Sequence, residues 1–399
     1  MFENVDNEVK KNIVEFYNLH KNECDELYSD ATNINKLKIY QTTKNDEWVK
    51  YLLIKTDIVI LTANFFEKNI LHLMASCNNK SKIIHYTINS YNNPQRPLYV
   101  NVYFFDIGDY HILHMEAKQT GSYSMGGSSD LIRYILKNEF CYPSAIISYG
   151  ICFGNNYHEY RIGDTIIAKK LYPYFMSAKV KEKNFFIEDS NIFNIDTQLD
   201  TKIQFLIGNS ELSKNNRIFY GNMVTGEAVI SNALMKDIFI NAATNQPVLG
   251  GEMEGYGLFK ECQGFDCFMP CMLIKSICDW GAYKNIDEKD IEIENLKDKL
   301  QAYASKQAYK TLEILLKKEN DIFEYSLYRQ ITNMVIMLSL KKGEVFHEAV
   351  LEDMLNRDVN KFKKYNNEKF LCKNIFNALV RDEIIEEVKE GIFSFKERK

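Results

Sequence analysis

Apolar residues from Asp57 onwards come in short, strand-length runs separated by segments with helical periodicity. This alternation is typical of a layered α/β domain, in which helices cover the faces of a sheet. We predict strands at residues 58–63, 83–88, 98–105, 112–117, 145–149, 165–168, 217–223 and 271–278. We predict helices at residues 65–75, 128–137, 232–241, 256–261 and 293–318.

A main domain at residues 51–318 with a smaller part on either side fits a chain of 399 residues, which exceeds the size at which one hydrophobic core usually stops growing. Residues 1–50 begin with a helix, because apolar side chains recur every three or four positions between residues 6 and 28, and end in a polar linker. We expect this helix to pack on the main domain rather than to serve as an arm that binds a partner.

Residues 319–399 have a different pattern, with helical segments at 322–340, 344–355 and 373–381 followed by a hairpin at 384–395. Helices followed by a terminal hairpin are typical of a winged-helix module. Acidic and basic residues are nearly balanced there, so the pattern favours protein contact over DNA reading.

Composition limits the classes of function. No window approaches the run of about eighteen apolar residues that a membrane span requires, and the acidic N-terminus lacks the basic-then-apolar layout of a secretory signal. Nine cysteines without a Cys-x-x-Cys pair fit a reducing compartment, so we expect a cytoplasmic protein. Seven histidines show no metal-binding spacing, and we predict neither a metal nor a cofactor. A net charge of -5 gives no general attraction to nucleic acid.

Two short stretches near the middle place carboxylates among apolar residues: Gly-Gly-Glu-Met-Glu-Gly at 250–255 and Ile-Cys-Asp-Trp at 277–280. We expect the first to form a turn and the second to end a strand. Burying a carboxylate costs several kcal/mol unless it is paired, hydrogen-bonded or protonated. Such positions are seldom kept for packing alone, and we therefore expect a functional role.

These stretches belong to a set of segments that resembles, in the same order along the chain, the nucleoside phosphorylase and nucleosidase superfamily. The likeness is strongest to 5'-methylthioadenosine/S-adenosylhomocysteine nucleosidase and its longer nucleotide-cleaving relatives, and it extends from about Asp57 to Leu316. The resemblance implies a three-layer α/β/α sandwich around a mixed, strongly twisted sheet, with the small winged-helix-like domain appended at the C-terminus. It also implies a small-molecule partner, a purine nucleoside or nucleotide.

Three acids have candidate roles through the resemblance. Asp279 matches the aspartate that protonates N7 of the leaving purine, with Trp280 beside it as an apolar neighbour. Glu254 matches the glutamate that holds the ribose 2' and 3' hydroxyls and opposes the positive charge that develops on the sugar, and Met253 would pack on the ribose. Glu67 stands where hydrolytic members keep the glutamate that activates water.

These residues also have structural alternatives. Asp279 could cap the turn after its strand, and Met253 could be an ordinary core residue. Glu67 lies in the first turn of a predicted helix, where an acid favours the helix dipole. Glu252 is two positions from Glu254 along the chain, and strand alternation is expected to direct it differently.

Loops supply the remaining candidates. Gly121 and Ser122 lie in a Gly/Ser-rich segment whose amides and hydroxyls suit a ribosyl or anionic group, although such loops are often only flexible turns. Gly150 resembles a residue of the strand-end turn that lines the pocket. Backbone groups of Val229 and Ile230 would meet the purine edge, and the nucleosidases commonly have phenylalanine where Val229 stands.

The resemblance leaves the nucleophile to be decided. Phosphorylases of this superfamily hold phosphate with an arginine where this chain has Ile147, Ser148 and Tyr149, so we favour hydrolysis by water over phosphorolysis. A catalytically silent nucleoside sensor that signals to the C-terminal module is a further alternative, although three retained acids favour an enzyme. Relatives with appended domains often act in antiviral defence, and family members partly build the 5' pocket from a neighbouring subunit, which implies a homo-oligomer.

Overall fold

The three-dimensional structure is a computed structural model of the chain. It describes residues 2–33, 39–41, 46–78, 81–90, 98–117, 121–122, 126–138, 140–174, 178–181, 184–187, 192–208, 217–227, 236–238, 240–241, 244, 246–264, 269–281, 293–339, 346–347, 368–389 and 392–395.

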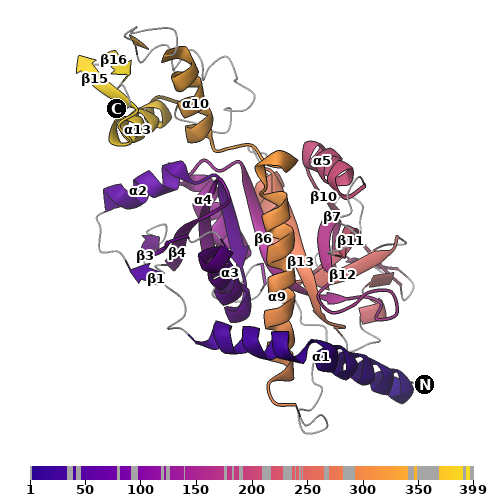
Figure 1. Ribbon diagram of the computed structural model, residues 1–399. Coiled ribbons are helices and arrows are strands. Elements are labelled where there is room, and N and C mark those ends of the chain that lie inside the picture. Colours follow the sequence, from indigo (N-terminus) through magenta and orange to yellow (C-terminus); the bar gives the residue numbers. More distant parts are fainter. Residues whose placement is uncertain are drawn as a thin grey trace.

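One mixed sheet organises the described part of the chain (Figure 1). Its strands are β1 (Ile39–Gln41), β2 (Ile58–Thr62), β3 (Ile83–Ser90), β4 (Leu98–Ile107), β5 (Tyr110–Glu116), β6 (Ala145–Gly154), β7 (Thr165–Pro173), β10 (Phe193–Asn194), β11 (Ile218–Thr225), β12 (Val248–Glu252) and β13 (Cys271–Asp279). They follow the order β1-β3-β4-β5-β2-β6-β12-β11-β7-β10, and β13 pairs with both β6 and β7. A separate hairpin consists of β8 (Ala178–Lys181) and β9 (Asn184–Ile187).

The helices of the main domain and its N-terminal extension lie around this sheet. They are α1 (Phe2–Thr32), α2 (Asp46–Lys55), α3 (Phe65–Asn78), α4 (Ser128–Lys137), α5 (Thr197–Gly208), α8 (Gly255–Gln263) and α9 (Leu296–Leu315). None of the described helices is long and apolar enough to cross a bilayer.

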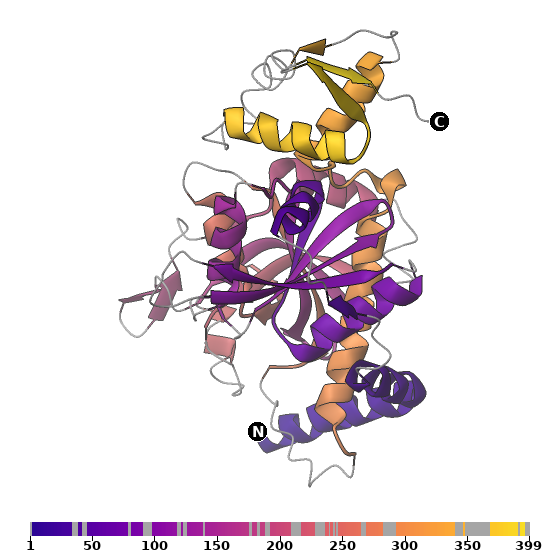
Figure 2. The same ribbon diagram turned by 90° about the vertical axis from the view of Figure 1, so that its left-hand side faces the viewer.

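Helices cover both faces of the sheet, which makes three layers. All of β2 is buried, with Ile58 and Ile60 in one apolar cluster and Val59 and Leu61 in another. The cluster of Ile58 includes side chains of α3, α5 and α9, and the cluster of Val59 includes α4 and α8. A strand buried on both faces has a continuous apolar sequence, as β2 does. The predicted α/β/α arrangement around a mixed sheet is confirmed, and Figure 2 shows how strongly the strands twist.

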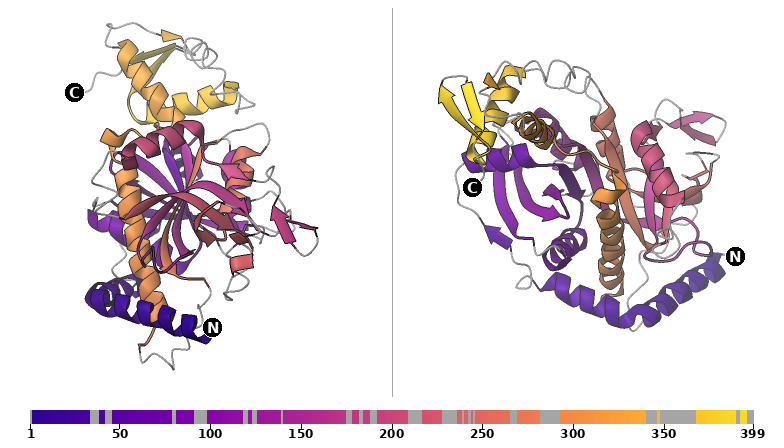
Figure 3. Two further views of the ribbon diagram at one scale, coloured as in Figure 1. Left: turned by 90° about the vertical axis from the view of Figure 1, so that its right-hand side faces the viewer. Right: turned by 45° about the horizontal axis from the view of Figure 1, so that its top comes forward.

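Strand β6 is the point where the sheet branches. β13 follows one of its edges, and the other edge pairs first with β2, at residues 145–148, and then with β12, at Phe153 and Gly154. From β12 the pairing continues through β11, β7 and β13 back to β6, so these strands close a ring (Figure 3). Around Ile151, between β2 and β12, no described strand pairs with this edge. Ligands of α/β proteins commonly bind where strands part in this way.

Two strands lie where the sequence predicted none. Val248–Glu252 is β12 rather than the expected turn, because Gly250 lets the chain approach β6: a Cβ there would stand 2.2 Å from the carbonyl oxygen of Phe153. Ile39–Gln41 is β1, which pairs in parallel with β3 inside the segment expected to be a linker. Part of the predicted helix at 232–241 lies outside the described residues.

Helix α1 packs on the main domain, as expected, and is longer than predicted. It crosses α9 and α3 at the lower edge of Figure 1, with a bend at His20. Lys299 and Lys306 of α9 form ion pairs with Asp25 and Glu23 of α1, at 2.8 and 2.9 Å. The helix therefore belongs to the body of the protein.

The C-terminal module comprises α10 (Leu327–Ser339), β14 (Phe346–His347), α13 (Glu368–Arg381), β15 (Ile385–Lys389) and β16 (Ile392–Phe395). The strands form a small antiparallel sheet that contains the predicted hairpin. Of the helix expected at 344–355, the structure describes only Phe346–His347, which is a strand. The module packs on α2 through an apolar cluster, and Asp382 accepts hydrogen bonds from Tyr51, Lys55 and Tyr328.

The junction with this module gives a testable boundary. Ile322 and Phe323 are buried in the core of the main domain, and the Ser326 N–H donates to the buried Asp57 carboxylate at 2.9 Å. A chain that ends at residue 318 would lose these contacts, whereas one that ends at residue 326 would keep them. We expect the shorter chain to be less stable by about 3 kcal/mol or more, because two large apolar side chains and a partner of a buried carboxylate are lost. Urea denaturation of both chains measures the difference, and equal stability would show that the core ends before Ile322.

Candidate active site

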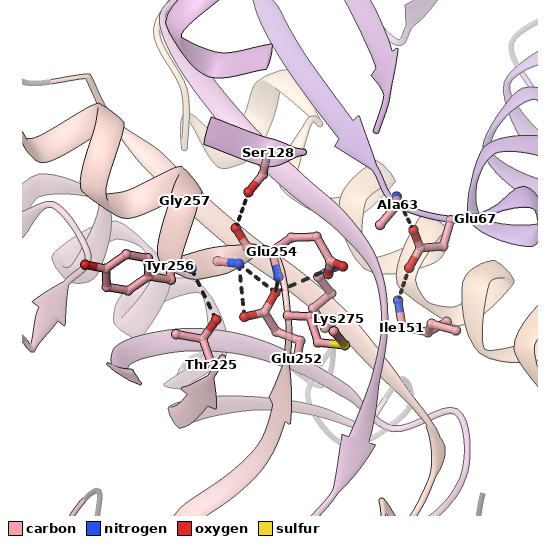
Figure 4. Close-up of polar contacts among 12 residues, drawn as sticks. Ala63, Glu67, Ser128, Ile151, Thr225, Glu252, Glu254, Tyr256, Gly257 and Lys275 are labelled. Atoms are coloured by element: carbon pink, nitrogen blue, oxygen red, sulfur yellow. Dashed lines mark hydrogen bonds and ion pairs between the residues drawn. The ribbon is translucent and has the colours of Figure 1, made fainter. Parts of the chain in front are cut away.

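Glu67 ties the start of α3 to the open edge of β6. Its N–H donates to the Asn64 side chain at 2.9 Å, and its Oε2 accepts from the N–H groups of Asn64 and Ala63 at 3.1 and 2.6 Å. This reciprocal pattern is a capping box. The other oxygen accepts the Ile151 N–H at 2.9 Å, in the gap between β2 and β12 (Figure 4). Glu67 therefore caps the start of α3, as its structural alternative predicts. Its carboxylate also lies at the branch point of the sheet on β6.

Gly150 has to be glycine because the Glu67 carboxylate occupies the place of its side chain. A Cβ at Gly150 would stand 2.0 Å from Glu67 Oε1, and φ at this residue is +153°. We expect Gly150 to line the pocket through its backbone, and the structure places it directly against a candidate acid.

Lys275 is a candidate site residue that sequence reasoning missed. It lies on β13, is fully buried, and places Nζ 3.1 Å from Glu254 Oε2 and 4.0 Å from Glu252 Oε2 (Figure 4). The negative charge of Glu67 also raises the pKa of Lys275. Lysine is almost never buried without a partner, so its position within an apolar run was a usable signal. The ammonium group joins β13 to β12 and α8.

Three carboxyl groups, those of Glu67, Glu252 and Glu254, act on the single ammonium group of Lys275. Burial raises the pKa of Glu67 and of Glu252, the latter to about 7, although Lys275 lowers both. Burial alone would lower the pKa of Lys275, but Glu254, Glu67 and Glu252 raise it overall. Three ionised carboxylates around one ammonium would leave a net negative charge in a buried site. Burial therefore favours the protonated form of Glu252, whose pKa is raised to about 7.

Glu252 serves the start of α8 and does not point away from Glu254. The expectation that the two acids diverge is wrong. Alternation directs residues two positions apart to the same face of a strand, and both carboxylates face Lys275, at 4.0 and 3.1 Å. The Glu252 carboxylate accepts the N–H groups of Glu254 and Gly255 at 2.9 and 2.8 Å. Thr225 Oγ1 accepts the next N–H, that of Tyr256, at 3.2 Å. Side chains thus satisfy the first donors of α8.

Ser122 completes this set and brings its loop next to Glu254. Its Oγ accepts the Gly257 N–H at 2.8 Å and lies 3.3 Å from the carbonyl oxygen of Met253. Ser128 Oγ donates to the carbonyl oxygen of Glu254 at 2.8 Å. The structure therefore brings together Ser122, Met253 and Glu254, the residues that we predict to form the sugar site.

Asp279 ends β13, four residues beyond Lys275, and is half-buried. Its Oδ1 accepts the Gly281 N–H at 2.7 Å, which is the turn-capping contact considered as its structural alternative. Trp280 is buried against Gly154, and its indole N–H has no hydrogen-bond partner among the described residues. Among the described residues, Asp279 makes no hydrogen bond to Glu67, Glu252 or Glu254. Val229 and Ile230 lie outside the described residues.

Comparisons with known proteins can now be set beside this geometry. No protein-family model matches the sequence. The chain is similar to a death domain-containing ATP nucleosidase from Amphimedon queenslandica, with 26% identity over 168 residues, which are 37% of this chain and 30% of that protein. The match thus spans less than a third of that protein's length. This similarity confirms the resemblance to the nucleosidases.

Solved structures of similar shape include nucleosidases. One is 5'-methylthioadenosine/S-adenosylhomocysteine nucleosidase from Helicobacter pylori with butyl-thio-DADMe-Immucillin-A, at 14% identity, 65% of this chain, 97% of that chain and a TM-score of 0.49. The same enzyme from S. pneumoniae with MT-ImmA has 18% identity, 66% and 99% coverage and a TM-score of 0.46. Futalosine hydrolase of Helicobacter pylori has 14% identity, 65% and 97% coverage and a TM-score of 0.48.

The close approach of Gly150 and Glu67 predicts a coupled pair of mutations. Gly150→Ala should lower the free energy of unfolding by about 3 kcal/mol, because the new methyl group meets the carboxylate. In a Glu67→Ala background the same change should cost at least about 1 kcal/mol less. Gly208→Ala is the control, since nothing lies within 4 Å of a Cβ there. Additive effects in urea denaturation would contradict the contact.

The raised pKa of Glu252 predicts how stability depends on pH. A carboxyl with a higher pKa in the folded protein stabilises the fold at low pH, and this contribution is lost as the pH rises past the folded pKa. For Glu252 the window runs from its ordinary 4.5 to about 7. We expect the free energy of unfolding to fall by up to about 3 kcal/mol across it, with Glu67 acting in the same direction.

Urea denaturation at several pH values tests this dependence. Glu252→Gln should flatten the slope, since the neutral amide has no proton to lose. Glu261→Gln, on the outer part of α8 where Glu261 pairs with Arg133, should leave the slope as in the parent protein. An unchanged slope in Glu252→Gln would assign the retained proton to another group.

Proposed function

We propose that the protein is an N-glycosidase that hydrolyses the bond between a purine base and its ribose in a nucleoside or nucleotide, with adenine as the first candidate base. The observation that carries the proposal is the buried group of Glu67, Glu254 and Lys275 at the branch point of the sheet. Similarity to an ATP nucleosidase supports the same activity and puts ATP first among the substrates to test.

Each acid has a chemical task in this proposal. Glu254 would accept hydrogen bonds from the ribose hydroxyls while Lys275 holds one of its oxygens, so the carboxylate is oriented before substrate arrives. Glu67 would take a proton from the attacking water. It accepts three backbone N–H groups, and a carboxylate has about four acceptor sites, so capacity remains for water. Asp279 would give a proton to N7 of the leaving base.

Water is favoured over phosphate as the nucleophile by charge. A phosphate dianion would have to enter beside Glu67, Glu252 and Glu254, and Lys275 is already paired with Glu254. The first N–H groups of α8 have acceptors in the protein, so this helix end does not offer them to an anion. These contacts add to the absence of arginine among Ile147, Ser148 and Tyr149.

Two other functions remain as alternatives with distinct outcomes. A phosphorylase would need phosphate and would yield a sugar phosphorylated at C1. A catalytically silent sensor would bind a nucleoside and release no base. We favour the hydrolase because a sensor has no use for a proton donor and a water-activating base in one site.

The proposal extends to the cellular setting. We propose a cytoplasmic homo-oligomer in which a neighbouring subunit completes the 5' pocket, and a C-terminal module that contacts protein rather than DNA. We further propose a role in antiviral defence, in which removing adenine from nucleotides would be the effect. Light scattering on the purified chain tests the oligomer, and a monomer that releases base would remove the need for a partner subunit.

Base release with defined variants tests the activity. Across a panel of adenine and guanine nucleosides and nucleotides, chromatography should show free base and an unphosphorylated sugar, with or without phosphate. Asp279→Asn should lower turnover about a hundredfold, or about 3 kcal/mol, because the amide keeps the shape but has no proton to give. Glu261→Gln is the matched control. A variant Asp279→Asn that keeps half of its rate would remove Asp279 from the mechanism.

A further inference from the structure

Glu227, just after β11, directs its carboxylate onto the loop at Gly121 and Ser122. The Ser122 N–H donates to Glu227 Oε1 at 2.8 Å, across 105 positions of sequence. Gly121 has φ of +102°, and a Cβ there would stand 2.6 Å from Glu227 Oε2. Both the left-handed backbone and the close approach call for glycine. Gly121 and Ser122 are thus both packed against the Glu227 carboxylate.

The same contact continues from Ser122 to the start of α8. Ser122 Oγ accepts the Gly257 N–H at 2.8 Å and lies 3.5 Å from the carbonyl oxygen of Glu254. Thr225, two residues before Glu227, accepts the Tyr256 N–H. Thr225 therefore contacts the first turn of α8 directly, and Glu227 does so through Ser122. Glu254 is the N-cap residue of this turn.

Charge gives Glu227 a second effect. Burial raises the pKa of Tyr174, and the negative charges of Glu252, Glu254 and Glu227 raise it further, so all three carboxylates act electrostatically on one phenol. An anion at the loop would meet this negative charge and would also find the Ser122 N–H already engaged. An exposed loop amide is what an anion would otherwise use.

We propose that Glu227 is a positioning and specificity-determining residue, which holds Glu254 in place through Ser122 and keeps inorganic phosphate out of the loop at Gly121. The part about Glu254 rests on the proposed function, whereas the exclusion of phosphate stands without it. The observation that carries both is the Glu227 carboxylate seated on the Ser122 N–H against Gly121.

Two substitutions separate the hydrogen bond from the charge. Glu227→Gln keeps an oxygen that accepts the Ser122 N–H but removes the charge, and Glu227→Ala removes both. The control is Glu261→Gln, which neutralises a carboxylate on the outer part of α8. A purely structural tie predicts that Glu227→Gln behaves like the parent protein in every assay.

Binding of inorganic phosphate is measured first, by thermal unfolding of the full chain in a phosphate titration at fixed ionic strength. Phosphate should leave the midpoints of the parent protein and of Glu261→Gln unchanged. It should raise the midpoint of Glu227→Ala in a saturable way and that of Glu227→Gln less, because only the alanine also frees the Ser122 N–H, and a ligand that binds only the folded state stabilises it. The idea is wrong if phosphate stabilises the parent equally or fails to stabilise Glu227→Ala, and this reading does not depend on catalysis.

Base release is measured next, on the same proteins. Without phosphate, Glu227→Gln should keep its rate within about threefold, whereas Glu227→Ala should lose about tenfold or more in kcat/KM with a raised KM, because Glu254 is no longer held. Phosphate should lower the rate of Glu227→Ala further and leave the parent unaffected. Full activity in Glu227→Ala would overturn the positioning role. If the parent protein released no base, the proposed function would fall, while the phosphate titration would still decide the exclusion.

Discussion

The ion pair between Lys275 and Glu254, deep in the protein, is the interaction on which the rest of the site depends. It is fully desolvated on the lysine side and lies within reach of Glu67 and Glu252. Breaking a buried pair by removing one partner typically costs about 3 to 5 kcal/mol, because the other charge stays buried. Removing either partner would therefore leave an unpaired buried charge and destabilise the fold, and this cost keeps the two side chains in place. Such a site can present charge to a substrate without reorganising.

The topology of the sheet explains why the charges meet there. β6 pairs with β2 at residues 145–148 and with β12 at residues 153–154. Between these two stretches the Ile151 N–H donates to Glu67. β13 runs along the other edge of β6 and brings Lys275 level with Gly150. β12 then delivers Glu252 and the start of α8. Acids that are far apart in sequence therefore lie around one lysine because β2 and β12 both end beside the branch point of β6, next to the middle of β13.

Much of the fold could be predicted from the sequence, because continuous apolar runs such as that of β2 reflect burial on both faces. Glu254 could be singled out because a carboxylate in an apolar segment needs an explanation, whereas Glu67 could be named only through the resemblance to the nucleosidases. β12 was missed because its glycines look like a turn until β6 is beside them. Lys275 was missed although its place in an apolar run was a signal, and its sequence neighbours do not show which acids it meets. Glu227 was missed because its partner, Ser122, lies 105 positions away.

A crystal structure of the protein with a purine nucleoside analogue whose glycosidic bond cannot be cleaved would test the proposed site directly. We expect the ribose hydroxyls within hydrogen-bond distance of Glu254, Asp279 facing N7 of the base, and Glu67 on the side from which water attacks. An analogue bound away from Glu254 and Lys275 would contradict this expectation, because the buried charges would then have no part in recognising the substrate.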